Sequence, residues 1–247
     1  MPQSTATSAE GTTKQLAFVV YPGLTPLDLV GPLQVLSALP RIDPSYEVVV
    51  VGETLDVLPS DAVIKLAPSH TFDDVPNPYA IVVPGGDQPT LEACGDKRLI
   101  DYLRSAAESA ELVMSVCTGA IILASAGLLD ERPATTHWAF VDLLEGLGPT
   151  YRRERWVEDG KFLMTAGVSA GIDGALYVAS RLVGEDLAKV IQLGIEYDPE
   201  PPFGRIDWDP DVTEALRPIW RATREEEIAR HPHLAREARL GNPALAL

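Results

Sequence analysis

Cys117 is the residue whose sequence setting is most typical of a catalytic nucleophile. It follows the apolar run 112–116, which is typical of a buried strand, and precedes the small apolar residues 120–126, which suit a tightly packed helix. A strand that turns sharply into a helix presents the turn residue at its carboxyl end and needs small neighbours two residues away on each side. Ser115 and Gly119 meet that requirement, so the pattern is a cysteine version of the nucleophile elbow. The alternative is a small buried cysteine that only packs.

Two other chemically useful segments also follow expected strands. Asp28 comes after the apolar run 16–20, and Pro84-Gly85-Gly86 comes directly after the run 80–83. The carboxyl ends of adjacent parallel strands lie side by side, and ligands bind at that edge of an open α/β sheet. Two glycines allow positive φ and let backbone N–H groups approach a ligand. We therefore expect both segments to share a cleft with Cys117, although Asp28 as a helix N-cap and the glycines as an ordinary turn remain alternatives.

The chemistry of such a cleft would combine a thiol and a carboxyl group. A position at the amino end of a helix favours the thiolate of Cys117. No histidine adjoins it in sequence, so Asp28 is the better-placed acid–base group. Because two negative charges repel each other, one of the pair should hold a proton. The sulfur would then attack while the carboxyl group delivers the proton, and the N–H groups of Gly86 and Thr118 would stabilise developing negative charge.

Three further residues have weaker signals. His137 is expected in the first turn of a helix that begins near Thr136 and runs to about Leu147, where it would reach the cleft or pair with the backbone. His70 falls in an expected polar linker and should be solvated. Cys94 is expected to be a bystander.

Apolar runs alternate with helical patterns along the chain, which indicates an α/β fold with a parallel sheet. The run 46–51 is a further core strand, 54–66 predicts a small hairpin off the main sheet, and Asp159-Gly160 predicts the turn of a hairpin within 151–164. Helices are expected over 96–110, 172–183, 185–196 and 211–230, with a proline-stiffened arm at 197–204. Residues 1–14 are expected to be a disordered lead-in, 15–230 a single domain, and 231–247 a tail.

The composition narrows the partners and the setting. With 247 residues, 46% of them hydrophobic, the chain has the material for one large core. Its formal net charge of −16 disfavours nucleic acid and anionic membrane surfaces, although solubility alone explains such an excess. Two cysteines form no disulfide framework, and no Cys/His spacing suggests zinc, so no metal site is expected. The simplest setting is the reducing cytoplasm; no secretory signal and no apolar run of about 20 residues is present.

The ordered set of motifs resembles the ThiJ/PfpI superfamily, which is class I glutamine amidotransferase-like, and within it the isonitrile hydratase branch. The similarity spans about Leu16 to Phe203. A related branch carries the same motifs in AraC-type regulators with an appended DNA-binding module. The motifs are Leu27-Asp28-Leu29-Val30-Gly31-Pro32, Pro84-Gly85-Gly86, Ser115-Val116-Cys117-Thr118-Gly119-Ala120, Ala134-Thr135-Thr136-His137-Trp138 and Gly167-Val168-Ser169-Ala170-Gly171-Ile172-Asp173.

The resemblance implies a flavodoxin-like three-layer α/β sandwich with a mostly parallel central sheet, a homodimer, and a cysteine enzyme without a cofactor. In the hydratase branch the thiolate attacks the terminal carbon of an organic isonitrile while the carboxyl group supplies a proton. The resulting thioimidate reacts with water to release an N-substituted formamide. Carried over, Cys117 is the nucleophile, Asp28 the general acid/base and Thr118 the neighbour that tunes the thiol; the supporting residues would be Gly85, Gly86, His137 and Val168.

Two departures from the family pattern stand out. Asp87-Gln88-Pro89 makes the loop after the glycines acidic and stiff, and Ala166 stands where relatives are richer in glycine. The first bears on substrate choice and the second on the mobility of the late helix. The other readings are a glyoxalase-like enzyme or a protease of the same superfamily, or a non-enzymatic redox or ligand-sensing protein. The other enzyme branches typically carry Glu at the position of Asp28 or a histidine directly after the cysteine.

Overall fold

The computed structural model describes residues 13–86, 88–206, 208, 213–216, 218 and 229. The first strand already begins at Lys14, within the expected lead-in 1–14. The rest of that lead-in, apart from residue 13, and the expected tail 231–247 lie outside the described residues, as does most of the charged helix expected over 211–230.

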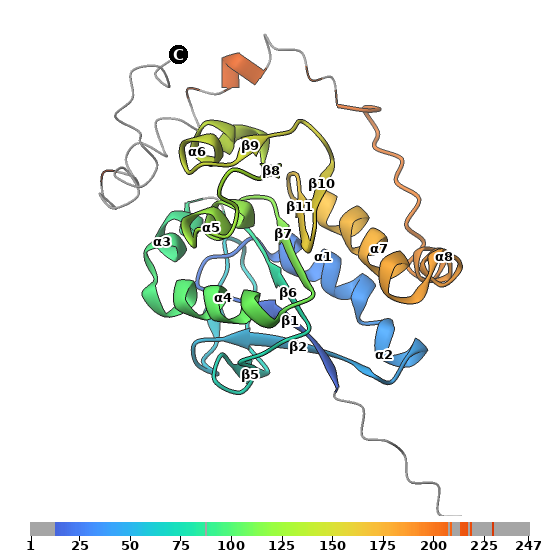
Figure 1. Ribbon diagram of the computed structural model, residues 1–247. Coiled ribbons are helices and arrows are strands. Elements are labelled where there is room, and N and C mark those ends of the chain that lie inside the picture. The colour runs from blue at the N-terminus through green and yellow to red at the C-terminus, as the bar shows by residue number, and fades with distance from the viewer. Residues whose placement is uncertain are drawn as a thin grey trace, which may run out of the picture.

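A seven-stranded sheet forms the centre of the structure (Figure 1), in the order β10-β11-β7-β6-β1-β2-β5. Every neighbouring pair is parallel except β10 and β11, which form an antiparallel hairpin. The expected α/β fold with a mostly parallel sheet is therefore confirmed. The strands are β1 (Lys14–Val19), β2 (Tyr46–Gly52), β5 (His70–Thr71), β6 (Ala80–Val83), β7 (Leu112–Val116), β10 (Trp156–Asp159) and β11 (Phe162–Thr165).

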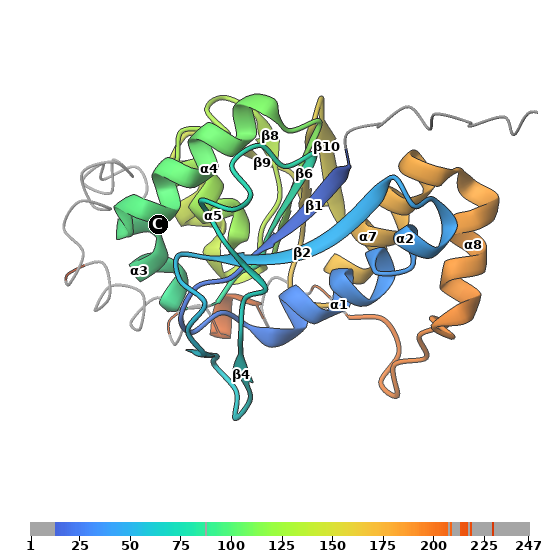
Figure 2. The same cartoon turned by 90° about the horizontal axis from the view of Figure 1, so that it is seen from below.

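Helices cover both faces of this sheet. In Figures 1 and 2, α1, α2, α7 and α8 lie on one side and α3, α4 and α5 on the other, which is the three-layer sandwich that the sequence predicted. Helix α6 follows the short 3₁₀ helix η1 (Trp138–Phe140) at one end of the molecule. The helices are α1 (Pro26–Leu36), α2 (Leu39–Ile42), α3 (Pro89–Gly95), α4 (Lys97–Ser109), α5 (Gly119–Ser125), α6 (Val141–Gly146), α7 (Ala170–Val183) and α8 (Glu185–Gly194).

The two helical layers explain the composition of the central strands. A strand that is covered on both faces has no side that favours polar residues, so it is apolar along its length rather than alternating. Residues 16–19 of β1 and 80–83 of β6 are fully buried. Because these strands are parallel neighbours, their carboxyl ends fall at one edge of the sheet, next to the end of β7.

Two small sheets stand outside the main one. Strands β3 (Leu58–Pro59) and β4 (Lys65–Leu66) form the expected hairpin, with shorter strands than predicted, and Figure 2 shows it projecting from the body. Strands β8 (Pro133–Ala134) and β9 (Thr150–Tyr151) pair in parallel. The predicted hairpin is confirmed between β10 and β11, but its turn is Gly160-Lys161, because Asp159 still pairs with Phe162; Gly160 has a φ of 62°.

Three local expectations differ from the structure. His70 is not in a linker, because it pairs with Val51 at the edge of the main sheet. The helix expected from Thr136 begins only at Trp138, since the Thr136 hydroxyl donates to the Cys117 carbonyl instead of capping a helix. Helix α3 was not expected, because a seven-residue helix is too short to show a clear apolar period. Within the described part of the chain, no helix is both long and apolar enough to cross a membrane.

Candidate active site

Cys117 lies on a tight turn between β7 and α5, with a φ of 56°. A non-glycine residue in this left-handed region carries a strain of about 1–3 kcal/mol, which surrounding contacts must offset. The Cys117 N–H donates to the carbonyls of Thr165 and Ala166, at 3.2 and 3.0 Å, and its carbonyl accepts the Thr136 hydroxyl at 2.9 Å. The predicted strand–turn–helix geometry of an elbow is therefore confirmed.

The small residues around Cys117 are required by the close approach of β6. A Cβ on Gly119 would lie 2.1 Å from the Val83 carbonyl oxygen, well inside any allowed contact. Ser115, on the other side, is fully buried in β7. The elbow thus packs directly on the end of the neighbouring strand, which leaves room for glycine alone at the first helical position.

The Asp28 carboxyl group contacts the loop Pro84-Gly85-Gly86 that follows β6, which is called the glycine loop below. Asp28 is in the first turn of α1, but the N-cap position belongs to Thr25, so the helix-cap alternative for Asp28 is wrong. Its Oδ2 accepts the Gly85 N–H at 3.0 Å. Its Oδ1 is buried and has no hydrogen-bond partner of normal geometry among the described residues. The carboxyl group is fully buried and interacts with the Cys117 thiol.

The glycine loop runs between this carboxyl group and the elbow. A Cβ on Gly85 would lie 2.4 Å from Thr118 Oγ1 and 2.8 Å from Asp28 Oδ2, so glycine is needed for the loop to fit. The Gly86 N–H donates to Thr118 Oγ1 at 3.1 Å. The backbone N–H groups that act on the Cys117 sulfur are those of Val168 and Thr118. Of the two predicted oxyanion donors, the backbone N–H of Thr118 therefore acts on the sulfur. The Gly86 N–H instead donates to the Thr118 hydroxyl oxygen.

Burial dominates the electrostatics of Asp28. It raises the pKa of this carboxyl group to about 7, because the charged form loses its hydration. The hydrogen bonds from Gly85 and Cys117 act in the opposite direction, and the charge of Asp61 adds to the increase. A carboxyl group in this state can hold or release a proton near neutral pH.

The Cys117 thiol does not have the low pKa that its place at a helix start predicted. Burial raises the pKa well above the ordinary value, and the charge of Asp28 adds to that effect. The N–H groups of Val168 and Thr118 lower it, but by less. The seven-residue helix α5 begins just after the sulfur, yet exclusion of water outweighs the favourable orientation of its peptide dipoles. The pair is therefore best described as a protonated thiol beside a carboxyl group that titrates near pH 7.

His137 supports the site by packing. A Cβ on Gly167 would lie 2.8 Å from His137 Cδ2, so the imidazole covers the backbone next to Val168. Its Nδ1 accepts the Ala139 N–H at 3.4 Å, which is the backbone pairing that the sequence left open. Burial lowers the pKa of His137 to about 4, so the ring is neutral at physiological pH.

Three hydroxyl groups around the site were not predicted from the sequence. Thr136 holds the Cys117 carbonyl, Thr90 contacts Thr118 at 2.7 Å between their Oγ1 atoms, and the Tyr21 hydroxyl donates to the Pro84 carbonyl at 3.1 Å. The position of Tyr21 in the sequence could have indicated a role in the site, because it directly follows a buried strand at the same edge of the sheet. Thr90 carried none, because it lies in the unexpected helix α3. No group of three or more His, Cys, Asp or Glu residues in the described part of the chain is arranged to hold a metal ion.

The fold and the site together define a flavodoxin-like α/β protein with a cysteine elbow at the carboxyl edge of its sheet. Residues 14–183 match the DJ-1/PfpI family, and the chain belongs to that family.

Individual proteins similar to this chain are found both by sequence and by structure. The chain is 43% identical over 191 residues to the isonitrile hydratase of Pseudomonas putida, covering 76% of this chain and 81% of that protein. Among solved structures, a ThiJ/PfpI family protein from Pseudomonas syringae superposes with a TM-score of 0.81 at 31% identity, over 93% of this chain and 96% of that one. Drosophila melanogaster DJ-1beta has a TM-score of 0.68 at 19% identity, over 76% of this chain and all of that one, and shares the fold.

Replacing Gly119 tests the close contact between elbow and sheet. Gly119→Ala should lower the free energy of unfolding by about 2–3 kcal/mol, because the new methyl group would overlap the Val83 carbonyl. Urea titration followed by circular dichroism measures this change. Gly194→Ala is the matched control, since nothing lies within 4 Å of its Cβ position. Equal stability of the two variants would show that the elbow does not pack on β6 in this way.

Replacing Asp28 tests its protonation state. A carboxyl group whose pKa is raised to about 7 in the folded protein contributes most stability below its unfolded pKa of about 4, and loses that contribution as the pH rises through 7. The Tm of Asp28→Asn should therefore rise relative to the native protein between pH 4 and 7 and then level off. Differential scanning fluorimetry across this range measures the difference. A Tm difference that does not change with pH would contradict the raised pKa.

Proposed function

We propose that this protein hydrates organic isonitriles to N-substituted formamides, with Cys117 as the nucleophile and Asp28 as the general acid and base. The observation that carries the proposal is the buried pair itself, a thiol on an elbow and a carboxyl group with a pKa of about 7. The 43% identity to the Pseudomonas putida isonitrile hydratase supports the choice of substrate.

The first step adds the thiol across the terminal carbon of the isonitrile. Asp28 takes the proton of the Cys117 thiol, and the sulfur forms a bond to that carbon, which is electrophilic and carries no hydrogen. Asp28 then delivers the same proton to this carbon, giving a thioimidate in which carbon bears both hydrogen and sulfur. Atoms and charge balance, because the thiol has added as S and H to one carbon. A carboxyl group with a pKa near 7 suits both halves of this transfer.

The second step uses water. Asp28 takes a proton from a water molecule while the water oxygen bonds to the thioimidate carbon, and it passes this proton to the nitrogen. The carbon–sulfur bond then breaks, and Asp28 transfers the remaining hydroxyl proton of the intermediate to the sulfur. The N-substituted formamide leaves, and the Cys117 thiol and the Asp28 carboxylate are restored. The N–H groups of Thr118 and Val168, which act on the sulfur, stabilise its negative charge as the bond breaks.

Other functions of the family receive less support from this site. Asp28 and Thr118 stand where the resemblance places Glu or a histidine in the glyoxalase-like and protease branches. A redox sensor needs an exposed thiol of low pKa, whereas the Cys117 side chain is buried and its pKa is raised. The regulator CdhR of Pseudomonas aeruginosa matches over 92 residues, only 36% of this chain and 27% of that protein.

We also infer a homodimer and a cytoplasmic setting. Leu27 and Val30 are 46% and 41% exposed on α1, on either side of Asp28 in sequence, and Val63 on the β3–β4 hairpin is fully exposed. Leu27 and Val30 are one helical turn apart, and such exposed apolar pairs favour an interface with a second copy. Both cysteines are free thiols, as suits a reducing compartment. Sedimentation equilibrium should give twice the monomer mass for the native protein and a lower mass for Leu27→Glu with Val30→Glu; a native monomer would exclude the dimer.

Turnover of an alkyl or aryl isonitrile tests the proposed reaction, with the formamide product measured by liquid chromatography and mass spectrometry. Cys117→Ala should abolish turnover, and Asp28→Asn should reduce kcat by about 10²–10⁴-fold, because the acid–base group is lost. Cys94→Ala, which removes the other buried thiol, should retain turnover. Absence of product with the native protein, or unchanged turnover in Cys117→Ala, would refute the proposal.

The same assay has an expected pH dependence. Below a pH of about 7 both Asp28 and Cys117 are protonated and no base is available, so kcat/KM should rise as the pH increases through about 7. It should then stay level beyond the ordinary thiol range, because the pKa of Cys117 is raised. An acid limb near pH 4 would contradict the raised pKa of Asp28 in the enzyme.

A further inference from the structure

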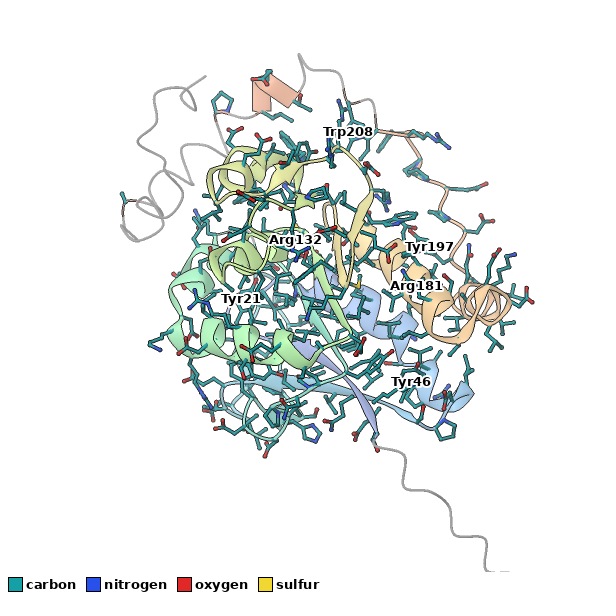
Figure 3. All side chains as sticks on the ribbon, in the orientation of Figure 1. Tyr21, Tyr46, Arg132, Arg181, Tyr197 and Trp208 are labelled. Atoms are coloured by element: carbon teal, nitrogen blue, oxygen red, sulfur yellow. The ribbon has the colours of Figure 1, made fainter. Side chains whose placement is uncertain are left out.

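A chain of buried hydroxyl groups connects the end of β1 to the elbow. The Tyr21 hydroxyl donates to the Pro84 carbonyl at 3.1 Å and lies 3.5 Å from Thr90 Oγ1. Thr90 Oγ1 is 2.7 Å from Thr118 Oγ1, which accepts the Gly86 N–H at 3.1 Å. Tyr21 is labelled in Figure 3. Its side chain is 4% exposed, and both threonines are fully buried, so water does not compete for these groups.

The donors and acceptors at the two ends fix the direction of this chain. An amide N–H can only donate, so Thr118 Oγ1 accepts the hydrogen bond from Gly86. A carbonyl can only accept, so the single hydroxyl proton of Tyr21 is donated to Pro84. The Tyr21 oxygen is then left as an acceptor for Thr90. When the Thr90 hydroxyl donates its one proton to the Tyr21 oxygen, it can only accept in its contact with Thr118. The Thr118 hydroxyl is then the donor to Thr90. The chain thus runs in one direction, from the Gly86 amide to the Pro84 carbonyl.

Both ends of the chain lie on the glycine loop that contacts Asp28. Between those ends, the Gly85 carbonyl accepts the Thr25 N–H at 2.9 Å and the Gly85 N–H donates to Asp28 Oδ2 at 3.0 Å. The loop has little room to move toward the elbow, because a Cβ on Gly85 would lie 2.6 Å from the Thr118 nitrogen. The hydroxyl chain therefore decides how firmly the Gly85 amide is held against the carboxyl group.

We propose that Tyr21 and Thr90 are positioning residues of the active site, whose hydroxyl groups hold the loop 84–86 so that the Gly85 N–H stays on Asp28. This role rests on the proposed function of the Asp28–Cys117 pair, but it acts on the pair itself and not on any substrate. It also means that the Thr118 hydroxyl proton is used within the chain, so Thr118 acts on the sulfur through its backbone N–H alone.

The proposal predicts a change in the titration of the pair. The Gly85 N–H lowers the pKa of Asp28, so a loosened loop should raise that pKa further. The other titratable groups that act on Asp28 are Cys117 at the elbow and Asp61 on the β3–β4 hairpin, and Tyr21 itself is coupled to Asp28. None of these charges is altered by Tyr21→Phe or Thr90→Val at neutral pH, since burial keeps Tyr21 protonated.

The test is the rate of Cys117 alkylation by iodoacetamide as a function of pH, read at that residue by peptide mass spectrometry. This reaction requires no isonitrile. In Tyr21→Phe and Thr90→Val the acid limb of the profile should move upward by about half a pH unit or more, the size expected for losing one hydrogen bond to the carboxylate. With an isonitrile substrate, kcat should fall by about tenfold while KM changes less than about twofold.

Tyr102→Phe is the matched control for the tyrosine. The Tyr102 hydroxyl also donates to a backbone carbonyl, that of Val75 at 3.1 Å, in a buried position on α4. It should lower the Tm as Tyr21→Phe does but leave the alkylation profile unchanged. A Tyr21→Phe profile that coincides with the native and Tyr102→Phe profiles would show that Tyr21 contributes stability only, and would overturn the proposal.

Thr90 provides an independent test if Tyr21→Phe does not fold. Thr90→Ser keeps the hydroxyl group and should restore the native profile, whereas Thr90→Val should not. Equal profiles for Ser and Val would overturn the proposal. If the native protein fails to hydrate isonitriles but these shifts are seen, the proposed function fails and the positioning role stands.

Discussion

The hydrogen bond from the Gly85 amide to the buried Asp28 carboxyl group is the interaction on which the rest of the site depends. It joins the first helix to the loop after β6, and that loop in turn contacts the elbow through Gly86 and Thr118. The carboxyl group is excluded from water, so its pKa is determined by burial, by this backbone donor, by the thiol of Cys117 and by the charge of Asp61. A small movement of the loop would therefore change the chemistry of both members of the pair.

The parallel sheet makes this convergence possible. Strands β1, β6 and β7 are adjacent and parallel, so the segments that follow them meet at one edge. The converging segments are crowded at this edge, as the glycine positions show. Gly119 faces the Val83 carbonyl and Gly85 faces both Asp28 and Thr118, at distances that admit no side chain. Tight packing and backbone strain at Cys117 together present the sulfur in one orientation, as pre-organised catalysis requires.

The pKa values of the pair show how tertiary environment overrides a local rule. A cysteine at a helix start is expected to ionise easily, yet burial and the neighbouring carboxyl group raise the pKa of Cys117. Such a thiol is not a general-purpose nucleophile. In the proposed reaction it becomes reactive when Asp28 accepts its proton, which couples attack to protonation and suits addition to a carbon that must gain both sulfur and hydrogen. Burial and the raised pKa of Cys117 also disfavour its oxidation, which depends on thiolate character and exposure.

The sequence by itself determined the α/β fold, the order of its core strands and helices, and the elbow at Cys117, because these follow from apolar runs, small residues and turn signals that act locally. It also predicted that Asp28, the glycine loop and Cys117 share one edge, because the carboxyl ends of parallel strands lie on the same side of a sheet; the tertiary structure decided that β1, β6 and β7 are neighbours. Only the tertiary structure decided that Asp28 is not a helix cap, that the thiol pKa is raised, and that the hydroxyl groups of Tyr21 and Thr90 hold the loop. These properties depend on burial and on partners far apart in the chain, and no local pattern encodes the distance between such groups or the water that they exclude.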